Sequence, residues 1–131
     1  QFLHPDEEQR FVSGKNLEPI SIKGVKVGFA ICYELAVHQH FETVKSLNPN
    51  VYVASVAKFE RGIEPAHIRL AAIARNGLPA LMVNAIGPAD DGICAGQSAV
   101  WNGAGKKLIE LPADETGILM YDTVSMKAWK V

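Results

Sequence analysis

With 131 residues, of which 48% are hydrophobic and 21% charged, the chain has the length of one domain and can bury a core. This composition excludes an intrinsically disordered protein, and the formal net charge of -1 argues against a nucleic-acid-binding protein, which needs a basic surface. No apolar run approaches the roughly 18 residues that span a bilayer, and no signal peptide is recognised. The two cysteines, Cys32 and Cys94, lie in different contexts and do not indicate a disulfide framework, so we expect a reducing, cytoplasmic setting.

Two strands are predicted after an acidic opening segment. Residues 1–14 are polar and acidic, and the apolar residues at their very start suggest a cut through a longer chain. Ile20 and Ile22 alternate with polar neighbours and predict a strand that pairs with 25–31 across a turn at Gly24. The second strand is largely apolar, which is typical of a strand covered on both faces.

Two helices are predicted next, separated by a strand. Apolar residues at helical spacing predict a helix over about 34–47, which stops before Pro49 because the residue preceding a proline disfavours the helical conformation. The run 51–56 predicts a strand parallel to the first, since a helix separates them. After a loop at 58–62, the second helix has Pro65 in its first turn and Gly77 at its C-cap. Its predicted buried face consists of Ala66, Leu70, Ile73 and Ala74.

The remaining residues predict strands, and the tail from Ser125 shows little pattern. The order strand, helix, strand, helix, strand and then antiparallel strands predicts an α/β fold with a mixed sheet. The assignments are a third buried strand at 81–85, a Gly-, Asp- and Pro-rich loop at 88–96, a hairpin of 98–101 with 106–111, and a last strand at 117–121.

Cys32 lies where the buried strand turns into the first predicted helix. The residue type alone favours a small buried apolar side chain. The carboxyl end of a strand, however, is where α/β folds place their chemistry, and backbone N–H groups at a helix N-terminus favour a thiolate. The N–H of Tyr33 is positioned to stabilise a developing oxyanion. Cys32 is therefore a candidate nucleophile.

The sequence also resembles a known family, the carbon–nitrogen hydrolases of the nitrilase and amidase superfamily. The resemblance covers nearly the whole chain and implies the C-terminal portion of a four-layer αββα sandwich, with a mixed sheet carrying helices on one face and with the N-terminal half of the domain absent. It rests on V-G-F-A-I-C-Y-E-L at 27–35, R-L-A-A-I-A-R-N-G-L-P at 69–79, V-N-A-I-G at 83–87 and G-Q-S-A-V-W-N-G-A-G at 96–105.

The resemblance implies cleavage of an amide, carbamoyl or nitrile C–N bond by a cysteine, a glutamate base, a lysine and a second glutamate. Cys32 matches the nucleophile. Glu8 matches the second glutamate, because E-Q-R-F-V-S-G resembles the family pattern and 32 minus 8 gives the family spacing of 24; Glu7 is the fallback if the register slips by one. The lysine is expected just before Gln1 and the base further upstream, so we expect the 131 residues alone to be inactive.

Lys58 and Phe59 are candidate substrate-contacting residues, because they follow the second parallel strand at its catalytic end; an ordinary loop is the alternative. The resemblance implies no cofactor or metal, a small-molecule partner rather than nucleic acid or membrane, and a homo-oligomer. The sequence departs from many relatives after the nucleophile, where Ala36, His38 and Gln39 replace an arginine and Pro-Glu. These departures put the substrate pocket in doubt.

Two alternative functions remain open. One is an inactive binding or regulatory module that keeps the fold, because a fold alone does not define activity. The other is a Cys–His hydrolase that uses His38 or His67. His38 and His40 are two apart on a helix, point to different faces and make a poor metal pair.

One face of the predicted sheet is expected to lack a covering layer. Without the first half of the sandwich, its apolar side chains would be exposed, and the missing half or another copy would cover them. These side chains are Val27, Phe29, Ile31, Val53 and Val83.

Overall fold

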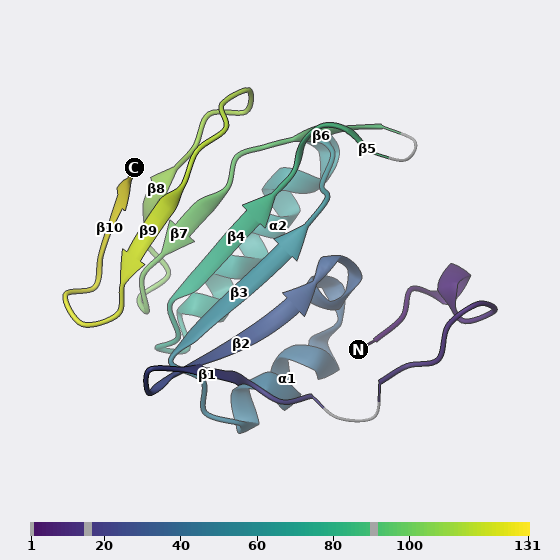
Figure 1. Cartoon of the computed structure of the whole chain (residues 1–131), viewed down its shortest axis with the longest axis horizontal. Helices are drawn as coiled ribbons and strands as arrows, with labels where there is room; N and C mark the ends of the chain where they lie inside the picture. The colour runs from purple at the N-terminus through teal and green to yellow at the C-terminus, as the bar shows by residue number, and fades with distance from the viewer. Residues whose placement is uncertain (1, 15–16, 90–91) are drawn as a thin grey trace.

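A six-stranded mixed sheet forms the centre of the computed structural model, which describes residues 2–14, 17–89 and 92–131 (Figure 1). The three central strands are parallel and the outer ones antiparallel. This arrangement confirms the predicted mixed sheet. The strands, in spatial order, are β1 (Ile20–Ile22), β2 (Val25–Ile31), β3 (Val51–Val56), β4 (Ala80–Asn84), β7 (Ala99–Trp101) and β8 (Lys107–Glu110).

The hairpin of β1 and β2 forms as predicted. Ile22 pairs with Val25, and the two residues between them, Lys23 and Gly24, have φ values of 48° and 83°. Two consecutive left-handed residues match the right-handed twist of the flanking strands, which makes this a favourable two-residue hairpin turn.

The first helix begins later than predicted. After β2 the chain forms a five-residue 3₁₀ helix, η2 (Cys32–Ala36), and the α-helix α1 (His38–Ser46) starts only after Val37, whose backbone is extended. The helical periodicity is present in both segments, but Val37 at ψ 111° interrupts it. The predicted continuous helix from residue 34 is therefore wrong.

The second helix begins earlier than predicted. α2 (Glu60–Ala74) starts directly after Phe59, so the expected loop at 58–62 is already helical at its end and Pro65 lies inside the helix rather than in its first turn. Gly77 has φ 80°, and its N–H donates to the carbonyl of Ala74 at the helix end, which supports the predicted C-cap.

Both α-helices cover the same face of the sheet (Figure 1). The core lies between them and the strands, and all four predicted buried residues of α2 are buried. Small side chains on β2 and β3 let the helices approach, while large ones on β3, β4 and β7 fill the remaining space. The main strand residues in this core are Ala30, Tyr52, Ala54, Met82 and Trp101.

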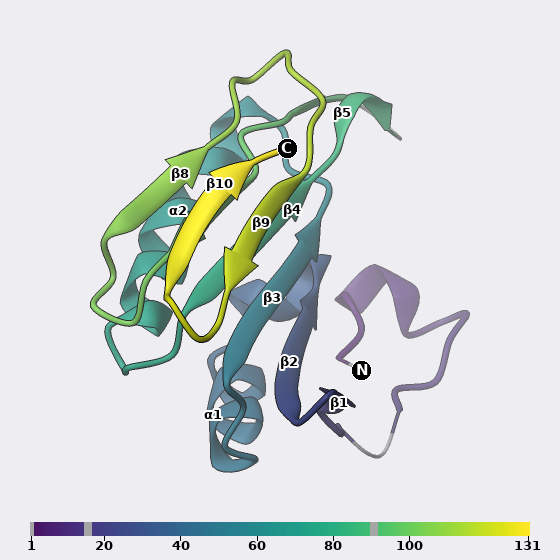
Figure 2. The ribbon, with the colours of Figure 1, turned by 60° about the vertical axis from the view of Figure 1, so that its left-hand side comes forward.

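A two-stranded ribbon lies on the other face, over the β7–β8 end of the sheet (Figure 2). It consists of β9 (Leu119–Asp122) and β10 (Lys127–Lys130). β9 was predicted; β10 was not, because the tail has no alternation of its own. The turn between the strands is closed by Asp122, which accepts hydrogen bonds from the N–H of Val124 and the hydroxyl of Ser125.

The Gly-, Asp- and Pro-rich segment is also a hairpin rather than a loop. β5 (Ile86–Ala89) pairs with β6 (Gly92–Ala95), and the predicted loop residues 90–91 lie outside the described ranges. Backbone contacts anchor β6 on the chain after β3: Ala95 donates to the carbonyl of Lys58, and Phe59 pairs with Cys94. Cys94, expected in a loop, is therefore buried within a strand.

Part of the face opposite the helices is uncovered. Ile31 is 51% exposed and Val83 55%, whereas Val27 on the same face is buried. The prediction of an uncovered apolar face thus holds for Ile31 and Val83, and the prediction that Val83 is buried in its strand is wrong. None of the helices within the described ranges is long and apolar enough to cross a membrane.

Candidate active site

Cys32 occupies the sharp turn at the carboxyl end of β2. Its φ is 46°, a left-handed conformation that is unfavourable for a residue with a Cβ and that occurs mostly where surrounding structure imposes it. The thiol is exposed. Cys32 lies at the predicted junction, but the helix that it opens is a short 3₁₀ turn, so the argument from an α-helix N-terminus does not apply.

The Cys32 cavity has a volume of about 290 Å³ and is lined by residues from the opening segment and from the β2–η2 junction. Its lining residues are Phe2, His4, Glu7, Ile31, Cys32 and Tyr33. Glu7, the fallback candidate, therefore lies against this cavity, whereas Glu8 is exposed outside its lining. The carboxylate of Glu7 accepts a hydrogen bond from the N–H of His4 at 2.8 Å, which closes the turn η1 (Pro5–Glu7).

His4 is a residue of this cavity that the sequence did not reveal. Its ring packs edge-on against Tyr33 with the centroids 5.0 Å apart, and its Nδ1 accepts a hydrogen bond from the N–H of Asp6. A histidine in a polar, acidic run has no periodicity that would distinguish it. Its proximity to Tyr33 depends on how the opening segment folds back onto the sheet.

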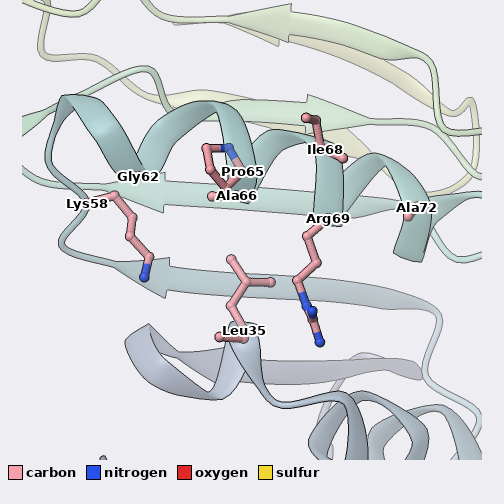
Figure 3. A pocket seen from close by; sticks show the side chains of 9 residues that line it. Leu35, Lys58, Gly62, Pro65, Ala66, Ile68, Arg69 and Ala72 are labelled. Atoms are coloured by element: carbon pink, nitrogen blue, oxygen red, sulfur yellow. The ribbon is translucent and has the colours of Figure 1, made fainter.

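Lys58 and Phe59 lie elsewhere. Lys58 lines an apolar groove of about 670 Å³ between η2 and α2, where Lys58 and Arg69 both extend toward Leu35 (Figure 3). The ring of Phe59 packs over Gly92, where a Cβ would lie only 2.9 Å from it. The structure therefore brings Cys32, Tyr33 and Glu7 together but places Lys58 on a different cavity.

Asn84 organises the chain at the carboxyl ends of β3 and β4. Its buried side-chain amide accepts a hydrogen bond from the N–H of Lys58 at 2.7 Å and donates to the carbonyls of Lys58 and Gly96 at 3.0 and 2.8 Å. Ser98 accepts a hydrogen bond from its backbone N–H. A polar residue ending a buried strand was the available signal, because a buried amide in that position must find partners.

Glu34 plays a comparable part beside Cys32. Although it is only 3% exposed, its two carboxylate oxygens accept backbone hydrogen bonds from Ile31 and Phe2. It thereby connects the residue before the thiol to the opening segment. The sequence placed Glu34 at the start of a helix and did not indicate that it is buried.

The two histidines considered as catalytic bases lie outside the Cys32 cavity. His38 is exposed and faces Glu42 along its helix, with 3.9 Å between Nε2 and Oε1. His67 is bonded to the carbonyl of Gln97 and to Lys107. His40, by contrast, is completely buried, which confirms that His38 and His40 point to different faces.

The parallel strands, the helices on one face and the cysteine turn define an α/β protein of the nitrilase type. The carbon-nitrogen hydrolase profile matches residues 3–130, and the chain belongs to that family. The predicted family and fold class are confirmed.

Three relatives illustrate this membership. An (R)-stereoselective amidase from Pseudomonas sp is 32% identical over 117 residues, which are 86% of this chain and 42% of the relative. Glutamine-dependent NAD+ synthetase from Acinetobacter baumannii superposes with a TM-score of 0.81 at 23% identity, covering 96% and 25% of the two chains. A mutant of the amidase from Nesterenkonia sp. AN1 gives 0.68 at 25% identity, covering 87% and 46%. The chain thus spans less than half of each relative.

Proposed function

We propose that these 131 residues form the C-terminal, nucleophile-bearing portion of a carbon–nitrogen hydrolase that cleaves a small amide, carbamoyl compound or nitrile. The observation that carries the proposal is the exposed thiol of Cys32 on a left-handed turn at the end of a central parallel strand. Family membership and the amidase relative support this reaction class.

The proposed reaction on an amide proceeds through a thioester. The sulfur of Cys32 attacks the carbonyl carbon, a C–S bond forms, the C–N bond breaks, and the nitrogen leaves with a proton. Water then hydrolyses the thioester, releasing the acid and regenerating the thiol. The N–H of Tyr33 is the nearest chain element proposed to hold the oxyanion. In support, the Nesterenkonia amidase undergoes Michael addition of acrylamide at its active-site cysteine.

A glutamate from the opening segment is proposed to complete this portion of the site. Glu8 has the family spacing, whereas Glu7 has the position, because it lines the Cys32 cavity. Comparing Glu7→Gln with Glu8→Gln separates the two. The variant that lowers activity at unchanged stability identifies the residue, and the other serves as its matched control.

The general base and the lysine are proposed to come from residues preceding this chain. Loss of proton transfer typically costs 10²- to 10⁴-fold in rate, and loss of oxyanion stabilisation about 10²- to 10³-fold. The 131 residues alone are therefore expected to show no turnover. A homo-oligomeric, cytoplasmic hydrolase remains part of the proposal. The alternative, an inactive binding module, is favoured by the fact that Glu7 is already engaged with the N–H of His4.

The test combines labelling with turnover. Iodoacetamide should alkylate exposed Cys32 well before buried Cys94. A complete chain carrying the upstream lysine and glutamate should hydrolyse an amide and lose that activity on Cys32→Ala, with Cys94→Ala as the control. Cysteine-dependent turnover by the 131 residues alone would show that the catalytic groups have been misplaced. An inactive complete chain would favour the binding module.

A further inference from the structure

Glu34 and His40 form a buried pair behind the Cys32 turn. Glu34 belongs to η2 and is 3% exposed; His40 belongs to the first turn of α1 and is 0% exposed. The Nε2 atom of His40 lies 3.5 Å from Oε2 of Glu34. A buried carboxylate is costly unless it is hydrogen-bonded, so this pair needs a structural or functional explanation.

The carboxylate of Glu34 holds both walls of the Cys32 cavity. Its Oε2 accepts a hydrogen bond from the N–H of Ile31 at 2.9 Å, and Ile31 immediately precedes the strained Cys32. Its Oε1 accepts one from the N–H of Phe2 at 2.8 Å, and Phe2 belongs to the segment that forms the opposite wall. Rotation of this one carboxylate would therefore move the thiol relative to the opening segment.

His40 is the polar side chain placed to prevent that rotation. Neither of its ring nitrogens has a hydrogen-bond partner within the described ranges, and Oε2 of Glu34 is just beyond good hydrogen-bond distance. The ring is also packed edge-on against Phe2, with the centroids 5.8 Å apart. A slight shift would let Nε2–H donate to Glu34, which turns the pair into a directional contact.

The surroundings favour a neutral imidazole. Burial lowers the pKa of His40 below its usual value of 6.5, and the negative charge of Glu34 opposes this effect only in part. The other buried polar group nearby is the hydroxyl of Tyr52 on β3, which has no hydrogen-bond partner in the part of the chain that the structure describes. Burial and the charge of Glu34 raise the pKa of Tyr52, so it also stays neutral.

We propose that His40 is a positioning residue for Cys32, acting through the carboxylate of Glu34. This inference rests on the proposed function, because it assigns to the pair the task of holding the nucleophile turn against the opening segment. His40 itself lies outside the Cys32 cavity and touches no reacting atom.

The test compares His40→Leu with His40→Gln. Leucine keeps the packing but removes the donor, and replacing a buried polar group by an apolar one is often neutral or stabilising, so the melting temperature should be retained. The amide of Ile31 should nevertheless exchange about tenfold faster, because a hydrogen bond to a charged acceptor is weakened. The rate at which iodoacetamide alkylates Cys32 should change by about threefold or more. Glutamine, which can still donate to Glu34, should restore both values.

A double-mutant cycle with Glu34→Gln tests the connection. If His40 acts through Glu34, His40→Leu should have little further effect in the Glu34→Gln background. Additive effects, or unchanged Ile31 exchange and Cys32 alkylation in His40→Leu, would overturn the inference. Neither measurement requires turnover. Failure of hydrolysis in the complete chain, with the coupling intact, would therefore count against the proposed function alone.

Discussion

Lys107 donates a hydrogen bond to Nδ1 of His67 at 3.1 Å, while Nε2 of the same ring lies 3.0 Å from the carbonyl of Gln97. This pattern identifies a neutral ring that donates from Nε2 and accepts at Nδ1. It ties α2 to β8 and to the residues before β7. The same ring packs edge-on against Trp101 with the centroids 5.0 Å apart. A neutral histidine is therefore part of the contact between the helix layer and the sheet.

Acid should weaken this contact. Burial first, and then the positive charge of Lys107, lower the pKa of His67 below its usual 6.5, and the folded state therefore binds protons less readily than the unfolded state. The stabilising contribution is complete above about pH 6.5 and is lost as the pH falls from there through the folded pKa. Urea unfolding between pH 8 and pH 5 should show falling stability, less steeply in His67→Gln. His40, shifted in the same direction, should preserve part of the slope in that variant. An identical slope in His67→Gln would contradict this assignment.

Asn84→Leu should destabilise the protein by roughly 2–4 kcal/mol. The substitution leaves the N–H and carbonyl of Lys58 and the carbonyl of Gly96 without their side-chain partner in a buried environment. Chemical denaturation measures the loss. Asn76→Leu is the matched control, because Asn76 is exposed at a helix end and water can replace its contacts. Equal effects of the two substitutions would show that the Asn84 network contributes little.

Gly105→Ala and Gly24→Ala should separate steric clash from backbone strain. Both glycines have positive φ, 79° and 83°, so alanine is strained at either position by roughly 1 kcal/mol. At Gly105 a Cβ would also lie 2.6 Å from Cγ of Arg75 and 2.7 Å from the carbonyl oxygen of Ala71. At Gly24 it would meet open space. Gly105→Ala should therefore lower the free energy of unfolding by clearly more than Gly24→Ala, and a reversed order would contradict the described packing.

Val83→Glu should reduce self-association of the isolated chain. Ile31 and Val83 are large apolar residues exposed on the sheet face opposite the helices, and such a surface favours contact with another chain or with the rest of the domain. Light scattering over a concentration series measures the effect. Ile68→Glu, on the exposed side of α2, is the control for a general effect of added charge. If the unmodified chain remains monomeric at high concentration, the sheet face does not drive association.

Local patterns in the sequence were sufficient for several elements because their determinants are neighbours in the chain. The alternation of Ile20 and Ile22 before Gly24 predicted a hairpin, and the spacing of Ala66, Leu70 and Ile73 predicted the buried face of a helix. The family resemblance was carried by contiguous motifs and is confirmed. In each case the period of the side chains or the backbone freedom of glycine was enough.

Other features depended on contacts between residues far apart in the sequence. β10 forms because β9 offers it a partner, and the β5–β6 hairpin is anchored by the backbone after β3, so neither is legible in its own segment. The cavity that unites Cys32 with Glu7 and His4 exists because Glu34 binds the N–H of Phe2, 32 residues away.

The sequence by itself determined the family, the α/β order of the strands and helices, and the candidate nucleophile. Only the tertiary structure decided which side chains share a cavity with Cys32, and why Lys58 is not among them. The physical reason is that hydrophobic periodicity reports on the local backbone, whereas buried polar groups such as Glu34, His40 and Asn84 must find partners wherever the fold brings them.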